Sequence, residues 1–223
     1  HPGVTGNMSL ELTLSGDEVV EAKTHVGYLH RGFEKLFERR LYMQVMPTCI
    51  RMCVPEADSN EYCFSAATEE LSGIEVPEKA QWLRMLALEM ARMQMLLRVV
   101  PGQGATFGLG IGTQWGMYVR ELILDRFEEL TGGRIYHMYM LPGGVRGDLP
   151  DGFKKRLEGN LKQAEDFLGR IENLIAHNSV FKKRSVGVGY LDPSWVDKYG
   201  VVGPNARGAG FARDVRKDYP YLK

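Results

Sequence analysis

Apolar residues recur at helical spacing in three stretches of this sequence, and this repeat constrains the fold more than any other feature. The first stretch covers residues 77–97, and Pro101 with Gly102 is expected to end its helix. Residues 118–130 and 153–176 show the same period. Each predicted helix has one apolar side that must be buried against a neighbour. The repeat therefore predicts a helical bundle.

A strand-like alternation precedes the helices. Residues 8–14 alternate apolar and polar side chains, residues 15–17 predict a turn, and residues 19–26 continue as a second strand. We expect one face of this hairpin to cover the helices. Glycine and proline become frequent after residue 186, so the end of the chain is expected to be largely irregular and to dock against a partner. The predicted fold class is α+β, mainly α: an N-terminal antiparallel β-hairpin packed on a helical bundle, followed by a Gly-rich segment. The expected boundaries are 1–28, 29–185 and 186–223.

Charge and cysteine usage exclude several classes of protein. The chain has 28 basic and 28 acidic residues, so it has no net charge to attract nucleic acid, and no nucleic-acid partner is expected. No apolar run reaches the roughly 20 residues that span a bilayer. The cysteines Cys49, Cys53 and Cys63 are odd in number and clustered, which favours a reducing compartment over a secreted disulfide framework. The scattered histidines show no zinc-ligand spacing.

The most specific motif is Leu29-His-Arg-Gly-Phe-Glu-Lys35, at an expected helix start. Alone, this stretch also fits a capped amphipathic helix, because Gly32 can form a turn and Glu34 favours the N-terminal end. Further segments accompany it in a fixed order: His1-Pro2 before it, then Pro142-Gly-Gly-Val145, and finally Gly203-Pro204 leading to Asp214-Val-Arg216-Lys217. Together they resemble the large catalytic-arm subunit shared by respiratory complex I and the energy-converting, membrane-bound nickel–iron hydrogenases. The family signature would comprise His30, Arg31, Gly32, Glu34 and Lys35.

The resemblance spans the whole chain and implies its surroundings. It implies a smaller partner subunit that holds an iron–sulfur cluster, and membrane-embedded partner subunits of a complex I-like assembly. It also implies a place in the peripheral arm, on the cytoplasmic face of the cell membrane. Relatives continue beyond the Asp-x-Arg-Lys segment, so we expect this chain to be an incomplete copy of a longer subunit.

The chain departs from both branches of the family at the expected site. In the hydrogenase branch, an arginine is followed two residues later by a Cys-x-x-Cys pair that helps to hold nickel and iron. Here Arg51 is followed by Cys53, but Glu56 replaces the second cysteine. Because a hard carboxylate replaces a soft thiolate, we expect no nickel–iron centre and no metal bound by this chain. The tyrosine and histidine that bind quinone in the other branch are replaced by Val54 and Thr5, and neither can donate a proton as those side chains do.

The resemblance implies a cavity between the His1-Pro2 loop and the turn from Arg51 to Asp58, beside the partner's iron–sulfur cluster. His1, Thr5 and Val54 are the expected substrate-pocket residues. Such a site can receive electrons without binding a metal of its own.

Four residues are the catalytic candidates: Cys53, Arg51, Glu56 and Asp58. The thiol of Cys53 suits a soft substrate such as polysulfide or other sulfane sulfur. Arg51 would stabilise the thiolate product, and Glu56 or Asp58 would relay protons. The expected function is reduction of sulfane sulfur coupled to ion pumping, as in the similar archaeal membrane-bound sulfane sulfur reductases. A subunit that reduces quinone or protons at a rearranged site, and a non-catalytic scaffold, are the alternatives.

Overall fold

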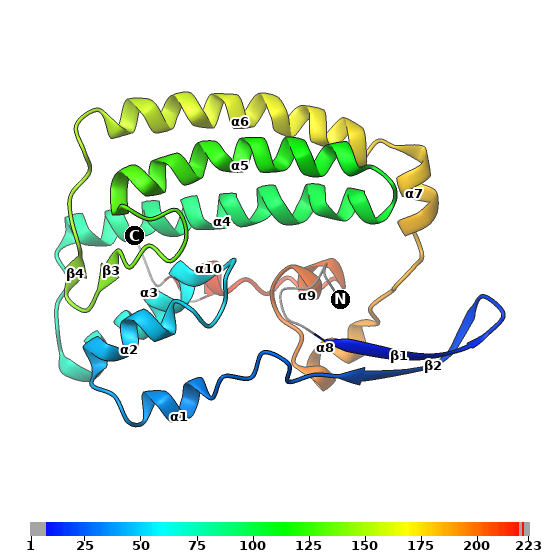
Figure 1. Ribbon diagram of the computed structural model, residues 1–223, viewed down its shortest axis with the longest axis horizontal. Helices are drawn as coiled ribbons and strands as arrows, with labels where there is room; N and C mark the ends of the chain where they lie inside the picture. The colour runs from blue at the N-terminus through cyan, green and yellow to red at the C-terminus, as the bar shows by residue number, and fades with distance from the viewer. Residues whose placement is uncertain (1–7, 219, 221–223) are drawn as a thin grey trace.

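The computed structural model describes residues 8–218 and residue 220. Within these residues, three long helices lie side by side and enclose the core (Figure 1): α4 (Glu78–Thr106), α5 (Gly110–Thr131) and α6 (Phe153–Ile175). Their facing sides bury apolar residues, among them Leu97, Ile123 and Phe127. Gly132 ends α5 with a φ of 78°, a conformation that glycine adopts without strain. The predicted bundle and the mainly α fold class are confirmed.

Helix α4 continues through Pro101 and Gly102, so the end predicted for it was wrong. Proline has no N–H to donate to the carbonyl of Leu97, which normally ends or kinks a helix. Here α5 packs against this point through Gly116. A Cβ atom at Gly116 would overlap both the Leu97 carbonyl oxygen and the Pro101 ring. Pro101 leaves this turn of α4 without one backbone hydrogen bond. The close packing of α5 supports the turn in its place.

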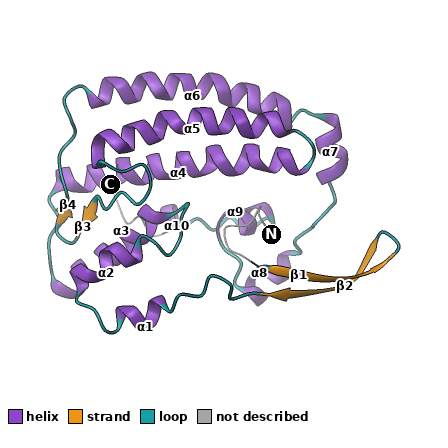
Figure 2. Ribbon diagram, viewed as in Figure 1, coloured by secondary structure: helices purple, strands orange, loops and turns teal. Residues whose placement is uncertain are grey.

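The shorter helices α1 (Phe33–Phe37), α2 (Tyr42–Cys49) and α3 (Ala57–Ser72) lead into the bundle (Figure 2). Strands β3 (Met140–Leu141) and β4 (Gly144–Val145) form a small antiparallel ladder, with Met140 opposite Val145. β3 contacts α3 and β4 contacts α4. This ladder links the segment after α5 to the helices that carry the candidate site.

The N-terminal hairpin was predicted correctly as an element, but its packing was not. Strands β1 (Ser9–Ser15) and β2 (Glu18–His25) pair antiparallel, with Ser9 opposite His25. They project away from the bundle (Figure 1), and all their residues except His25 are exposed. Leu10, Leu12 and Leu14 therefore do not cover the helices. Alternation in a strand indicates that one face is apolar, but it does not indicate which surface that face meets.

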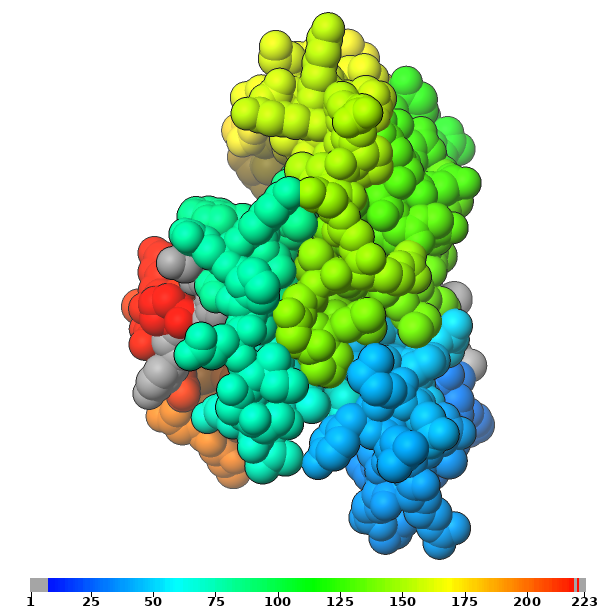
Figure 3. Space-filling view, turned by 90° about the vertical axis from the view of Figure 1, so that its left-hand side faces the viewer, coloured from blue at the N-terminus to red at the C-terminus, as the bar shows by residue number. Residues whose placement is uncertain are grey.

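The end of the chain is more regular than expected. After α7 (Ser179–Ser185) it forms the short helices α8 (Pro193–Tyr199), α9 (Gly203–Gly208) and α10 (Val215–Asp218). The side chain of Asp192 accepts the backbone N–H of Ser194 and starts α8 as a helix cap. The last described residues lie beside α4 (Figure 3). Across the described part of the chain, no helix is both long and apolar enough to cross a bilayer.

Candidate functional site

The turn between α2 and α3 carries most of the predicted catalytic residues, and the family signature holds it in place. A guanidinium nitrogen of Arg31, Nη2, donates to the backbone carbonyl of Arg51 over 2.7 Å. The Arg51 guanidinium donates to the carbonyl of Pro47 and lies 5.1 Å from the centre of the Tyr136 ring. Arg51 therefore joins the turn to a segment that follows α5.

The other signature residues shape α1. The N–H of His30 donates to Gly27, and Gly32 precedes the helix with a φ of 63°. Glu34 lies in the first turn, where a carboxylate is favourable. Lys35 pairs with Glu38 at the surface. Of the signature side chains, Arg31 is the one that the described contacts place at the candidate site.

Cys53, Val54 and Glu56 lie together in the turn. In the described part of the chain Cys53 is a free thiol and is partly buried, while half of Val54 is exposed. The hydroxyl of Ser59 donates to the Glu56 carboxylate over 3.1 Å. Burial raises the pKa of Glu56, and this effect outweighs the opposing influence of Ser59 and Arg92. Glu56 is therefore a carboxyl group that holds a proton more readily than an exposed glutamate.

Asp58, in the first turn of α3, has a different environment from the residues before that helix. It is 1% exposed, and its Oδ1 lies 2.8 Å from Nδ1 of His137. The His137 ring is stacked on Phe127, with ring centroids 3.7 Å apart. Sequence reasoning left His137 without a partner, because 79 residues separate it from Asp58 and no spacing rule links them.

His1 and Thr5 lie outside the described residues. Of the expected substrate-pocket residues, only Val54 is placed by the structure, and it lies at the surface of the turn.

A buried ion pair holds the turn formed by Pro142 to Val145. Arg84, which is 2% exposed, donates from Nη1 to Glu69 over 3.0 Å and from Nη2 to the carbonyl of Leu141 over 2.8 Å. Its Nε donates to the carbonyl of Gly144 over 3.1 Å. Glu69 in turn accepts the N–H of Gly143 over 2.8 Å. We call Arg84 and Glu69 the turn clamp; by fixing β3 and β4 it also positions the segment just before β3.

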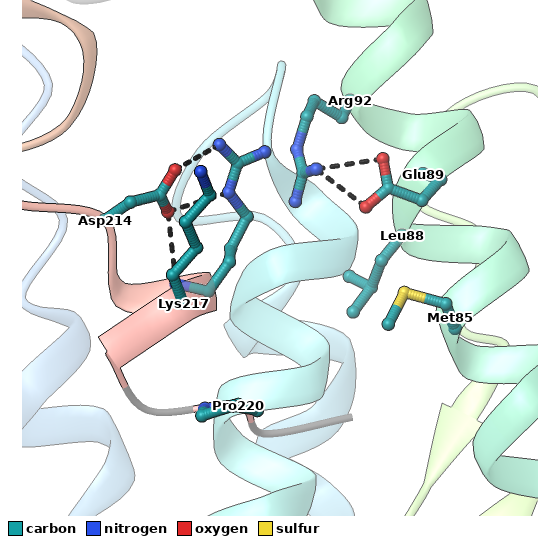
Figure 4. A pocket seen from close by; sticks show the side chains of 8 residues that line it. Met85, Leu88, Glu89, Arg92, Asp214, Lys217 and Pro220 are labelled. Atoms are coloured by element: carbon teal, nitrogen blue, oxygen red, sulfur yellow. Dashed lines mark hydrogen bonds and ion pairs between the residues drawn. The ribbon is translucent and has the colours of Figure 1, made fainter. Parts of the chain in front are cut away.

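A pocket of about 410 Å³ lies between α4 and the C-terminal segment (Figure 4). Arg92 on α4 donates to both carboxylate oxygens of Glu89, over 2.6 and 2.9 Å. Across the pocket Arg216 pairs with Asp214, and this hydrogen bond holds the pKa of Asp214 well below its usual range. The charge of Arg92 also lowers the pKa of Glu56, so this arginine links the pocket to the candidate site.

The turn offers one soft and one hard donor group. Cys53 supplies one thiol, whereas Glu56 supplies a carboxylate that is already bound to Ser59. Among residues 8–218 and 220, no three His, Cys, Asp or Glu side chains are grouped so that they could hold a metal ion.

Comparisons with known proteins agree on the kind of chain this is. The family model described as the 49-kDa subunit of respiratory-chain NADH dehydrogenase matches residues 108–223. A subunit of the NADH-quinone oxidoreductase of Thermosipho melanesiensis is 46% identical over 222 residues, which cover 100% of this chain and 60% of that relative. A subunit of the F(420)H(2) dehydrogenase of Methanosarcina mazei is 34% identical, with 100% and 59% covered.

A solved structure is also similar along the full chain. It is a chain of the membrane-bound sulfane sulfur reductase, an archaeal respiratory membrane complex, with a TM-score of 0.95 and 41% sequence identity. The match covers 100% of this chain and 60% of that one. The chain thus spans about 60% of the length of the first relatives it matches.

Proposed function

Because the chain belongs to the family of the 49-kDa subunit of respiratory-chain NADH dehydrogenase, we propose that it delivers electrons to an acceptor within a membrane-associated, complex I-like oxidoreductase. In this proposal the electrons come from an iron–sulfur cluster in a smaller partner subunit. Membrane-embedded partner subunits couple the reaction to ion pumping, and the chain lies in the peripheral arm on the cytoplasmic face. The similarity to a chain of a respiratory membrane complex supports this assignment.

The acceptor in this proposal is sulfane sulfur or polysulfide. The observation that carries it is the partly buried thiol of Cys53, which lies in one turn with Arg51 and Glu56. A soft sulfur substrate matches a thiol better than it matches a hard oxygen ligand. The 41% identity to the sulfane sulfur reductase chain gives the second line of support.

The side chains of the turn suit the chemistry of this reaction. Cleavage of a sulfur–sulfur bond takes up two electrons and two protons and yields two thiols. The guanidinium of Arg51 would stabilise a thiolate as it forms, because its charge and planar donors match a developing anion. Glu56, whose pKa is raised by burial, would hand on a proton to the product.

Reduction of quinone is the second candidate. Its support is the 46% identity to a chain named as part of an NADH-quinone oxidoreductase. Against it stands Val54, a half-exposed apolar side chain where the quinone-reducing branch has a tyrosine. Valine cannot donate the hydrogen bond or the proton that a quinone oxygen requires.

The two candidates predict different acceptors for the intact complex. With its natural electron donor, the complex is expected to reduce polysulfide in steady state and to show little turnover with a short-chain quinone or with protons. The measurement is the rate of sulfide release against the rates of quinol and hydrogen formation. Quinone turnover alone would contradict the sulfur assignment. Reduced partner clusters without turnover of any acceptor would indicate a non-catalytic scaffold.

Metal content gives a separate test. The purified complex is expected to contain iron from the partner clusters but no stoichiometric nickel, because Glu56 replaces a thiolate that the nickel site needs. Elemental analysis relative to the amount of this chain provides the measurement. About one nickel per copy of the chain would refute this expectation.

A further inference from the structure

Three titratable side chains gather in the interior beneath the candidate site. Asp58, Glu61 and His137 are 1%, 0% and 3% exposed. Asp58 and Glu61 are three residues apart on α3 and therefore neighbours on that helix, while His137 comes from the segment before β3. Buried ionisable groups are costly unless they are neutral or paired. The protonation of these groups follows from their contacts.

Asp58 and His137 form a buried pair in direct contact. Nε2 of His137 lies 3.1 Å from the carbonyl oxygen of Arg134, which can only accept, so Nε2 carries a hydrogen. Nδ1 faces Oδ1 of Asp58 over 2.8 Å. A hydrogen bond at this contact requires one more proton, either on the imidazole or on the carboxyl group. With that proton on the imidazole, the carboxylate of Asp58 keeps its negative charge.

Glu61 carries a second proton. Its Oε1 accepts the N–H of Met140 over 2.5 Å, whereas its Oε2 is buried and has no hydrogen-bond partner among the described residues. An ionised carboxylate would leave a charged oxygen unpaired in the interior. Burial, and then the nearby charge of Asp58, raise the pKa of Glu61 to about 8.

Charged and titratable groups surround Glu61 on each element packed against it. They are Asp58 on α3, Cys49 on α2, Arg84 on α4 and Arg146 after β4. The two arginines lower the pKa of Glu61, but less than burial and Asp58 raise it. When Glu61 loses its proton, the positive charges of these arginines lower the energetic cost of its buried negative charge.

The backbone around His137 is strained. Tyr136 and Met138, on either side of it, have φ values of 62° and 47°, which non-glycine residues rarely adopt. Such a conformation is unfavourable for these residues and persists where the surroundings enforce it. The turn clamp and the contact of Arg51 with Tyr136 provide this enforcement. These contacts thus keep the segment in the conformation that places the imidazole against Asp58.

We propose that Asp58, Glu61 and His137 form one internal proton store, which supplies a proton through Asp58 to the turn that carries Glu56 when an acceptor is reduced there. The reduced acceptor takes a proton from Glu56, and Glu56 takes one from the Asp58–His137 pair. Glu61 then refills this pair and is itself reprotonated from solvent. The store provides one of the two protons that sulfur–sulfur cleavage consumes, and the electrons come from the partner's iron–sulfur cluster. The delivery step rests on the proposed function, whereas the protonation of Glu61 does not.

The protonation is tested by infrared spectroscopy of the assembled complex with carbon-13-labelled glutamate. At neutral pH, the wild type is expected to show a buried protonated carboxyl signal that Glu61→Gln removes. Glu70→Gln, at an exposed position on the same helix, is the matched control and should keep the signal. The amide oxygen of glutamine still accepts the N–H of Met140, which favours normal folding. A wild type without this signal would overturn the proposal, whatever the turnover of the complex.

The delivery step is tested by the pH profile of turnover with polysulfide. The wild-type rate is expected to be high below pH 8 and to fall above it, as Glu61 loses its proton. In Glu61→Gln, kcat should fall about tenfold and this alkaline limb should disappear, with KM and reduction of the partner cluster unchanged. Asp58→Asn should lower kcat equally while the Glu61 signal remains. Wild-type kcat and pH profile in both variants would refute delivery, whereas a wild type inactive with every acceptor would refute the proposed function instead.

Discussion

Replacing Arg84 with methionine is expected to lower the free energy of unfolding by about 3–5 kcal/mol, the usual cost of breaking a buried ion pair from one side. The substitution leaves the buried carboxylate of Glu69 without its counter-charge. It also leaves the carbonyls of Leu141 and Gly144 without their donor. Denaturant-induced unfolding measures the loss. For a chain of this size, the melting temperature should fall by about 10 °C.

A matched control separates burial from charge. Lys79 on α4 pairs with Asp148 at the surface, and both side chains are well exposed. Lys79→Met should therefore change stability by at most about 1 kcal/mol. If Arg84→Met cost no more than this control, the turn clamp would not stabilise the fold.

Replacing Cys53 with alanine is expected to abolish reduction of polysulfide by the complex while the partner's iron–sulfur cluster is still reduced. In the proposed site the thiol is the soft group that meets the sulfur substrate. It acts after the partner's cluster in the electron path, so its removal should not prevent reduction of that cluster. The measurements are steady-state sulfide release and cluster spectroscopy on the same sample. Cys63→Ala, which removes an exposed thiol on α3, is the control and should retain turnover.

A further variant, Val54→Tyr, tests whether the tyrosine of the quinone-reducing branch is enough to allow quinone reduction. Val54→Tyr should not create quinone reduction, because one added hydroxyl does not replace the histidine that is absent at Thr5. Undiminished polysulfide turnover in Cys53→Ala would show that Cys53 is a packed thiol, and the sulfur assignment would lose its main support.

The long helices could be predicted from the sequence because their buried apolar residues recur at a regular spacing within each helix. Leu83, Met90 and Leu97 recur at helical spacing and are buried as expected. Gly132 stops α5 through its own backbone conformation, so its effect is visible in the sequence. The end of α4 was missed because the effect of Pro101 depends on Gly116 of the next helix.

The candidate site could be predicted only in part, for the same physical reason. Arg51, Cys53 and Glu56 lie within one short turn, so their proximity follows from the sequence alone. His137 reaches Asp58 across 79 residues, and Arg84 reaches Gly144 across 60. No local pattern encodes such contacts. His137 carried no signal that distinguished it from the other histidines.

The close pairing of α4 and α5 affects the order of events during folding. Only residues 107–109 separate the two helices, so their contacts close a short loop at little entropic cost. The contacts of Arg84 with Gly144 and of Asp58 with His137 close far longer loops. The helical hairpin is therefore expected to form early, and the proton store and turn clamp late. During synthesis, a ribosome-bound chain would contain this hairpin before residues 137–144 emerge to complete the site.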